Sequence, residues 1–229
     1  MSPERFKRIM DMLRHRQPDL TICLEMVHKS NNLAAIVRTA DAVGVENIHA
    51  VWPNQHMRVG GRTATGSQKW VNVKTHLATT DAISHLRAQK MQILATNLSP
   101  TSIDYREIDY TLPTAIILGQ EKHGISDEAL DLADQHVYIP MCGMVQSLNV
   151  SVASALILYE AQRQRQQANM YGSCQLDAAT CNRILFEGGY PIYAEACRRK
   201  KLPYPQVDDQ GQIQASSQWW QAVRSLTTS

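Results

Sequence analysis

The sequence predicts an α/β protein with a mostly parallel β-sheet that helices cover on both faces. Short apolar runs of strand length alternate with longer runs of helical periodicity between Leu20 and Gln167, and this alternation is typical of parallel sheets. The strand runs are apolar almost throughout, as expected for strands that are buried on both sides. No internal repeat interrupts the pattern.

The expected elements follow in chain order. A helix over Pro3 to His15 opens the chain and stops before Pro18, because the residue preceding a proline disfavours helical backbone. Six strands are expected, at Leu20 to Met26, Asn47 to Val51, Val71 to Thr75, Gln92 to Ala95, Thr114 to Leu118 and His136 to Ile139. Helices are expected at Leu33 to Val43, Thr80 to Gln89, Asp127 to Ala133, Val150 to Gln167, Asp177 to Phe186 and Pro191 to Lys200, before a Pro-rich, mostly irregular tail.

Composition narrows the class of protein. A chain of 229 residues can bury one substantial core with appendages and needs no disulfides. No apolar run is long enough to cross a bilayer, and the charged N-terminus lacks the apolar segment of a signal peptide, so we expect a cytoplasmic protein. Five scattered cysteines without a CxxC pair fit reduced thiols, and Cys142 is expected as a small packing residue. No metal is expected, and the eight histidines are expected at the surface or facing RNA.

Basic residues gather near both ends of the chain although the net charge is only +2. Such clusters can neutralise RNA phosphates, and they can equally be solvated helix faces. We expect a central domain over residues 20–168, with a helical N-terminal extension over 1–19 and a C-terminal extension over 169–229 that bind RNA. The candidate RNA-binding residues are Arg8, Arg14, Arg16, Arg198, Arg199, Lys200 and Lys201.

A strand, a loop and a helix meet between Val137 and Tyr159. A small, flexible loop is followed by polar residues, of which Ser147 or Asn149 can cap the helix that begins there. Free backbone N–H groups at this helix start favour an electronegative ligand edge. An ordinary strand–loop–helix joint would have the same pattern.

Two other segments carry polar residues within or directly after apolar runs. Asn32 and Arg38 lie six apart, within reach of one surface of the expected helix, which Ser30 or Asn31 would cap and Gly44 would end. An arginine in an apolar run faces a phosphate, a carboxylate or a polar cleft, or else forms a rim salt bridge.

The other segment follows the strand that ends at Leu118. There Gly119 precedes Glu121, a turn is expected at Gly124, and Ser126 would cap the next helix. A carboxylate just beyond the end of a buried strand lies where open α/β sheets bind ligands. A glutamate in a solvated turn is the alternative.

Taken in this order, the segments NNLAAIVR, LGQEKHGIS and IPMCGMVQSLNVSVASAL resemble the three motifs of the SPOUT class of RNA methyltransferases, and most closely those of its TrmH family. HAVWP, ILATNLS, LFEGGYP and KLPYP extend the similarity over nearly the whole chain. The resemblance implies the α/β-knot fold with a deep C-terminal trefoil knot, a homodimer, and the cofactor S-adenosylmethionine. The implied activity is 2′-O-methylation of guanosine 18 in the D-loop of tRNA.

The resemblance also implies the site residues. The implied catalytic group is Asn32, Arg38, Glu121, Ser147 and Asn149, with Arg38 as clamp and oxyanion stabiliser, Glu121 orienting Arg38 or the cofactor, and Ser147 and Asn149 holding Asn32. The implied cofactor contacts, mostly through backbone groups, are Thr96, Leu98, Gly119, Ile139, Met141 and Leu148. An rRNA 2′-O-methyltransferase of the same fold, or a non-catalytic module that binds or folds tRNA, would carry much of the same pattern.

Overall fold

The computed structural model describes residues 1–52, 69–120 and 122–225. The chain divides into two compact units. The sheet unit comprises Gln17–Tyr171, and the terminal unit combines Met1–Arg16 with Gly172–Ser229. Both ends of the chain, which the sequence presents as separate extensions, therefore contribute to one compact unit.

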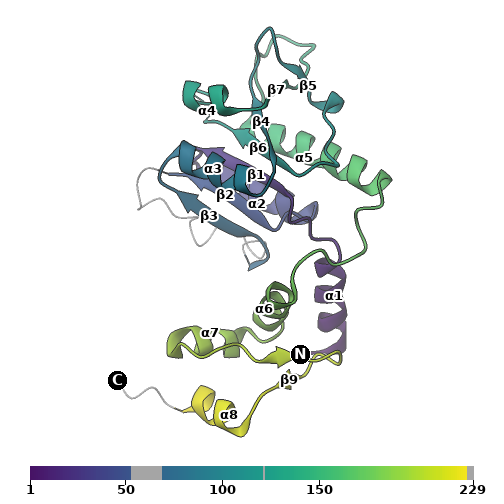
Figure 1. Cartoon of the computed structure of the whole chain (residues 1–229), viewed down its shortest axis with the longest axis vertical. Helices are drawn as coiled ribbons and strands as arrows, with labels where there is room; N and C mark the ends of the chain where they lie inside the picture. The colour runs from purple at the N-terminus through teal and green to yellow at the C-terminus, as the bar shows by residue number, and fades with distance from the viewer. Residues whose placement is uncertain (53–68, 121, 226–229) are drawn as a thin grey trace. The chain divides into compact units, whose positions relative to one another are not determined.

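The sheet unit is built on a parallel sheet, as predicted (Figure 1). Within the described residues the sheet has seven strands, in the order β3-β2-β1-β6-β4-β7-β5, and every neighbouring pair is parallel. The strands are β1 (Leu20–Glu25), β2 (Asn47–Val51), β3 (Asn72–His76), β4 (Gln92–Thr96), β5 (Ile103–Asp104), β6 (Thr114–Leu118) and β7 (Gln135–Tyr138). The six predicted strands are confirmed to within one residue at each end, and β5, which has only two residues, was not predicted.

Helices cover both faces of the sheet, which confirms the predicted fold class. The helices α2 (Ser30–Ala42) and α5 (Val150–Gln167) share one apolar cluster with Ile22 and Leu24 of β1. On the opposite face α3 (Thr79–Ala88) and α4 (Asp127–Leu132) pack with Cys23, which lies between Ile22 and Leu24 on β1. Successive side chains of a strand point to opposite faces, so a continuously apolar strand supplies both clusters. The trefoil knot stays a prediction.

The start of α2 differs from the prediction. The helix begins at Ser30, and Lys29 occupies the N-cap position with extended backbone and no side-chain cap bond, so the expected caps Ser30 and Asn31 are wrong. Both residues instead lie inside the first turn. The end of the helix is as expected, since Gly44 adopts φ 87°, a left-handed conformation that glycine accepts at low cost.

The terminal unit is mainly helical. It contains α1 (Pro3–Leu13), α6 (Ala178–Gly189), α7 (Pro191–Lys200) and α8 (Ser217–Arg224), with a short antiparallel pair of β8 (Gln206–Val207) and β9 (Ile213–Gln214). The tail after Lys200 was predicted as mostly irregular, and the strand pair and α8 within it were not predicted. Trp219 and Val223, one turn apart on α8, join the cluster around Phe186, and Ser216 caps this helix. Tertiary burial of two apolar side chains stabilises a helix too short to form alone.

Three histidines of the sheet unit lie together, which the surface prediction missed. His49 of β2 is buried, and its Nδ1 lies 2.9 Å from Nε2 of His76 on β3. The ring of His85 on α3 lies 5.3 Å from that of His49, centroid to centroid. Burial, followed by the charges of His76, Lys74 and His85, lowers the pKa of His49 to about 3. His49 is therefore neutral in the folded protein at physiological pH.

Candidate functional site

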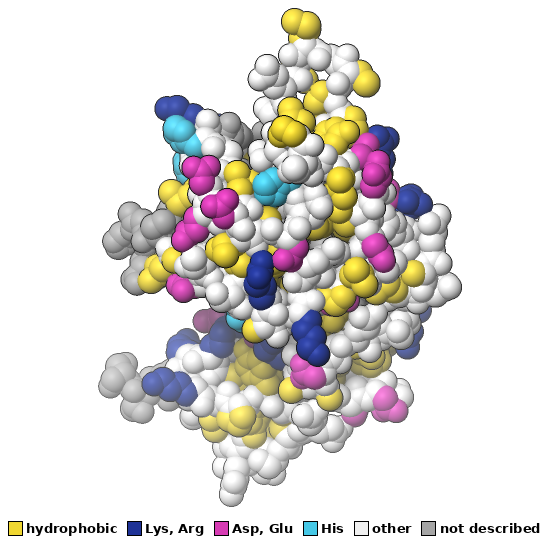
Figure 2. Space-filling view, turned by 45° about the horizontal axis from the view of Figure 1, so that its top comes forward, with side chains coloured by type: hydrophobic (Ala, Val, Ile, Leu, Met, Phe, Trp, Pro, Cys, Tyr) yellow, Lys and Arg dark blue, Asp and Glu magenta, His cyan; other side chains and the backbone are white. Residues whose placement is uncertain are grey.

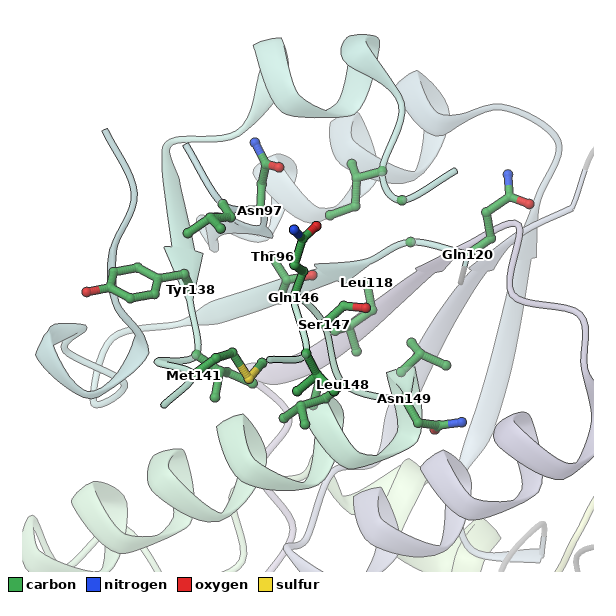
Figure 3. A pocket seen from close by; sticks show the side chains of 18 of the residues that line it. Thr96, Asn97, Leu118, Gln120, Tyr138, Met141, Gln146, Ser147, Leu148 and Asn149 are labelled. Carbon is green, nitrogen blue, oxygen red and sulfur yellow. The ribbon is translucent and has the colours of Figure 1, made fainter. Parts of the chain in front are cut away.

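One pocket of about 1460 Å³ opens at the carboxyl ends of β4, β6 and β7. These strands are neighbours in the sheet in the order β6-β4-β7, so the segments that follow them meet at one edge. The loop over residues 141–149 and the first turn of α2 complete the lining. Figure 3 shows Thr96 and Leu118 at strand ends, with Met141, Ser147 and Leu148 along the loop that enters α5. The structure thus brings all three sequence motifs to one cavity.

All six predicted cofactor contacts line this pocket: Thr96, Leu98, Gly119, Ile139, Met141 and Leu148. The Thr96 hydroxyl donates a hydrogen bond to the Ile117 carbonyl, 3.1 Å away, so this side chain is engaged within the sheet. Most of the other side chains in the set are apolar. Polar recognition at these positions therefore falls to backbone N–H and C=O groups, in line with the expectation from the sequence.

The turn after β6 requires glycine at its first position. Gln120 N donates to the Gly124 carbonyl (3.1 Å), and Gly124 N donates to the Gln120 carbonyl (2.9 Å). This pairing folds the backbone so tightly that a Cβ on Gly119 would lie 2.2 Å from the carbonyl carbon of Gly124. Gly124 adopts φ 69°, as a turn residue should. The predicted Glu121 lies between them, outside the described residues.

Asn149 joins the two helices that begin at the pocket. Its Oδ1 accepts hydrogen bonds from the backbone N (2.8 Å) and the hydroxyl (2.6 Å) of Ser151, and so caps α5. Its Nδ2 donates to Oδ1 of Asn32 in the first turn of α2, at 3.2 Å. Asn32, Ser147 and Asn149 all line the cavity. One amide therefore holds the start of α5 and the side chain of Asn32 in fixed relation.

Arg38 stands apart from these groups. It lies on α2 six residues beyond Asn32, which corresponds to about 9 Å along the helix axis. Its side chain is exposed and does not line the pocket. The structure of one chain therefore brings together three of the five expected catalytic residues, while Arg38 is directed to solvent and Glu121 lies outside the described residues.

A buried glutamate that was not predicted as a site residue holds one end of the turn after β6. Glu25 ends β1 and is 4% exposed. Its Oε1 accepts hydrogen bonds from the hydroxyls of Thr79 (2.6 Å) and Ser126 (2.7 Å), and its Oε2 accepts one from Ser126 N (2.7 Å). Ser126, as predicted, caps α4, with its Oγ 3.2 Å from Ala129 N. Glu25 therefore anchors the far end of the turn that begins at Gly119.

The N-terminal basic residues differ in exposure. Arg8 and Arg14 are exposed, and Arg14 lies 3.6 Å from Asp11. Arg16 is fully buried, and one of its Nη atoms lies 3.2 Å from the Met12 sulfur. A guanidinium with no exposed surface cannot contact an RNA phosphate, so Arg16 is a structural residue in this conformation and not a phosphate ligand.

The basic residues 198–201 also differ in their contacts. Lys200 donates to the backbone carbonyls of Ala222 and Val223 near the end of α8 (2.8 and 3.1 Å), and Arg198 pairs with Glu195 at 2.8 Å. Arg199 and Lys201 are exposed and form no ion pair with another described residue. Figure 2 shows basic and acidic side chains interspersed on the face it presents, so charge alone marks no single RNA-binding patch there.

Comparison with known proteins agrees with the motifs. Residues 19–159 match the model of the SpoU rRNA methylase family, and residues 163–216 match the C-terminal SpoU methylase model. The tRNA (guanosine(18)-2′-O)-methyltransferase of Escherichia coli is 60% identical over 227 residues, which cover 98% of this chain and 99% of that protein.

Solved structures agree with this result. The structure of the Aquifex aeolicus TrmH/SpoU tRNA modifying enzyme superposes with a TM-score of 0.76 at 39% identity, over 82% of this chain and 96% of that one. An rRNA methyltransferase from Sinorhizobium meliloti, solved with AdoMet bound, matches at 34% identity with a TM-score of 0.57, over 66% of this chain and 59% of that one. The family resemblance read from the sequence is confirmed, and the chain belongs to the SpoU rRNA methylase family.

Proposed function

We infer that this chain transfers a methyl group from S-adenosylmethionine to the ribose 2′-oxygen of guanosine 18 in tRNA. The observation that carries the inference is the convergence of all three sequence motifs on one pocket at the carboxyl ends of β4, β6 and β7. The substrate follows from the near full-length similarity to the E. coli guanosine 18 enzyme, at 60% identity.

The pocket suits S-adenosylmethionine in its chemistry. The cofactor has no phosphate, so it needs no glycine-rich phosphate cradle, and the chain has no GxGxxG motif. Apolar side chains such as Leu118, Ile139 and Leu148 offer surfaces for an adenine ring, while the backbone of the tight turn at Gly119 offers hydrogen-bonding groups. When bound, the cofactor supplies an electrophilic methyl group on a sulfonium.

The protein's own residues position the ribose oxygen and stabilise the charge that develops on it. A guanidinium does not give up its proton at neutral pH, so Arg38 acts as a clamp and anion stabiliser and not as a base. Asn32, held by Asn149, presents an amide at the pocket wall, whereas Arg38 lies outside the pocket of its own chain. Ser147 lies in the loop that precedes α5 and lines the pocket. Glu121 orients Arg38 or the cofactor in this proposal.

Exposed basic residues of the terminal unit bind the tRNA backbone in this proposal, namely Arg8, Arg14, Arg199 and Lys201. Contacts to phosphates give affinity without sequence selectivity. No helix in the described part of the chain is long and apolar enough to span a membrane. The cytoplasm is the compartment we propose, because the tRNA substrate is there.

A homodimer is also part of the proposal. Val152, Leu156 and Tyr159 are spaced along α5 on one surface stripe and remain 46%, 38% and 52% exposed. Met144 and Val145, in the loop that lines the pocket, are also largely exposed. Large apolar side chains that remain exposed in this way are typical of a protein interface.

A methylation assay on defined RNA tests the function. Purified chain, S-adenosylmethionine and an unmodified tRNA transcript should yield 2′-O-methylguanosine, detected by nucleoside mass spectrometry. The matched control carries 2′-deoxyguanosine at position 18, which lacks the acceptor oxygen and should gain no methyl group. Equal methylation of both RNAs would contradict the assignment to this ribose, and unchanged 2′-O-methylguanosine in tRNA from cells without the gene would contradict the cellular role.

A further inference from the structure

Two cysteines of the terminal unit lie side by side. The Sγ atoms of Cys174 and Cys181 are 3.1 Å apart. Cys174 is exposed in the segment before α6, and Cys181 lies half-exposed in the first turn of that helix. Each sulfur also lies within 4 Å of the Leu176 carbonyl, at 3.9 and 3.7 Å. The local fold therefore brings both thiols to a distance about 1 Å longer than the ~2.05 Å of a disulfide.

The other cysteines lack this combination of a partner and access to solvent. Cys23 and Cys197 are buried, and burial raises the pKa of both thiols, that of Cys23 to about 12. Cys142 is exposed, so its predicted packing role was wrong, but it belongs to the sheet unit. It is the natural reference for an accessible thiol without a neighbouring one.

We propose that Cys174 and Cys181 form a reversible oxidation site, which closes to an intramolecular disulfide when the protein meets hydrogen peroxide. One thiolate attacks a peroxide oxygen, the O–O bond breaks, and a sulfenic acid and hydroxide form. The second thiolate then attacks the sulfenic sulfur, the S–O bond breaks, and the S–S bond forms as hydroxide leaves. Two protons, one from each thiol, convert both hydroxides to water. The two sulfurs lose two electrons in total, which the peroxide gains.

The bond would fix a defined part of the terminal unit. Cys174 follows Gly172, whose N–H donates to the Arg14 carbonyl just after α1, at 3.1 Å, and which adopts φ 99°. A disulfide would tie this segment to the first turn of α6 and restrict the loop between them. Every described residue that lines the cofactor pocket belongs to the sheet unit. We therefore expect oxidation of this pair to leave the affinity for S-adenosylmethionine unchanged.

Peptide mapping of the full chain tests the proposal directly. Trypsin cleaves after Arg165 and Arg183, so both cysteines fall in one peptide, residues 166–183. After mild peroxide and alkylation with iodoacetamide, this peptide should be 2 Da lighter than its reduced form and carry no alkyl group. Dithiothreitol before alkylation should restore two alkyl groups. Cys142, in a different tryptic peptide, reports the oxidant dose in the same sample.

Variants separate a built pair from incidental oxidation. Cys174→Ser should abolish the light form and leave Cys181 as a sulfenic acid or a mixed disulfide, whereas Cys142→Ser should form the internal disulfide as the parent does. In the parent protein, the pair should be oxidised at a dose that leaves most Cys142 intact. Oxidation of Cys142 with no light form of peptide 166–183, or a light form that appears only after Cys142 is consumed, would overturn the proposal.

Discussion

Glu25 is not among the residues that line the cofactor pocket, but its replacement by alanine should loosen the pocket. The carboxylate accepts three hydrogen bonds, one from Thr79 and two from Ser126, at 2.6 to 2.7 Å, and it is 4% exposed. Ser126 follows the turn that begins at Gly119, and Gly119, Gln120 and Gly124 line the pocket. Loss of the anchor frees that end of the turn, so both stability and cofactor affinity should fall.

The magnitude follows from the groups left behind. Each hydrogen bond to a charged group contributes about 1.5–3 kcal/mol, and contributions that share one acceptor do not add fully. We expect Glu25→Ala to lower the free energy of unfolding by about 3–5 kcal/mol, because the donors of Thr79 and Ser126 lose their acceptor at about 1–3 kcal/mol for each unsatisfied group. Loss of one ordered backbone contact to the cofactor, at about 1.4 kcal/mol, would raise the Kd for S-adenosylmethionine roughly tenfold. Glu25→Gln should lie between, because one amide oxygen replaces two carboxylate oxygens.

Urea unfolding and calorimetric titration with S-adenosylmethionine measure these two quantities. Arg165→Met is the matched control, because Arg165 is fully buried and bonded to Asp19, Gln17 and Tyr110 at a distance from the pocket lining. It should lose comparable stability and keep its cofactor affinity. If Glu25→Ala binds the cofactor within twofold of the parent, or if both variants weaken binding equally, Glu25 has no specific positioning role.

Three other predictions concern turnover, RNA binding and pH. Arg38→Ala should lower the rate of single-turnover methylation of tRNA about 10²–10³-fold and leave the Kd for the cofactor unchanged. Arg38→Lys should restore little activity, because an ammonium group cannot replace the planar guanidinium. Near-parental rates would remove Arg38 from the mechanism. Joint replacement of Arg199 and Lys201 by alanine should weaken tRNA binding. It should also reduce the slope of log binding constant against log salt concentration by about 2. Replacement of Arg198 and Lys200, which have partners within the protein, should not have this effect. Burial and neighbouring basic groups lower the pKa of His49 to about 3, below the ~6.5 of an unfolded chain. The unfolded state therefore binds more protons as pH falls below 6.5, so stability should drop by about 2 kcal/mol from pH 7 to pH 5. His49→Gln should flatten this dependence in urea unfolding, and an unaltered slope would assign it to other groups.

The sequence predicted what local signals and parallel topology determine. The strands β2 and β6 and the helix α5 have the predicted bounds, because continuous apolar runs and a capped helical period are local properties. The helix α8 was missed because it is stabilised by packing of Trp219 and Val223 against the cluster around Phe186, which is distant in sequence. His49 was misjudged for the same reason, since its burial depends on β3 and α3.

The residues of the candidate site also differ in whether local sequence or long-range contacts determine their role. Residues that line the pocket follow strands whose ends must meet at one edge of a parallel sheet, so Gly119, Met141 and Asn149 were accessible to prediction from the sequence and the family motifs. Glu25 acts through Ser126, 101 residues away in the chain. Its charge in an apolar strand is visible locally, but its partner is not. Arg38 is the opposite case, because its family motif is clear while one chain leaves its side chain outside the pocket. Motifs therefore identify groups that meet the reactants, whereas the groups that hold them in place appear only when long-range contacts are known. Glu25 and Arg38 are accordingly the two positions at which mutagenesis carries the most new information.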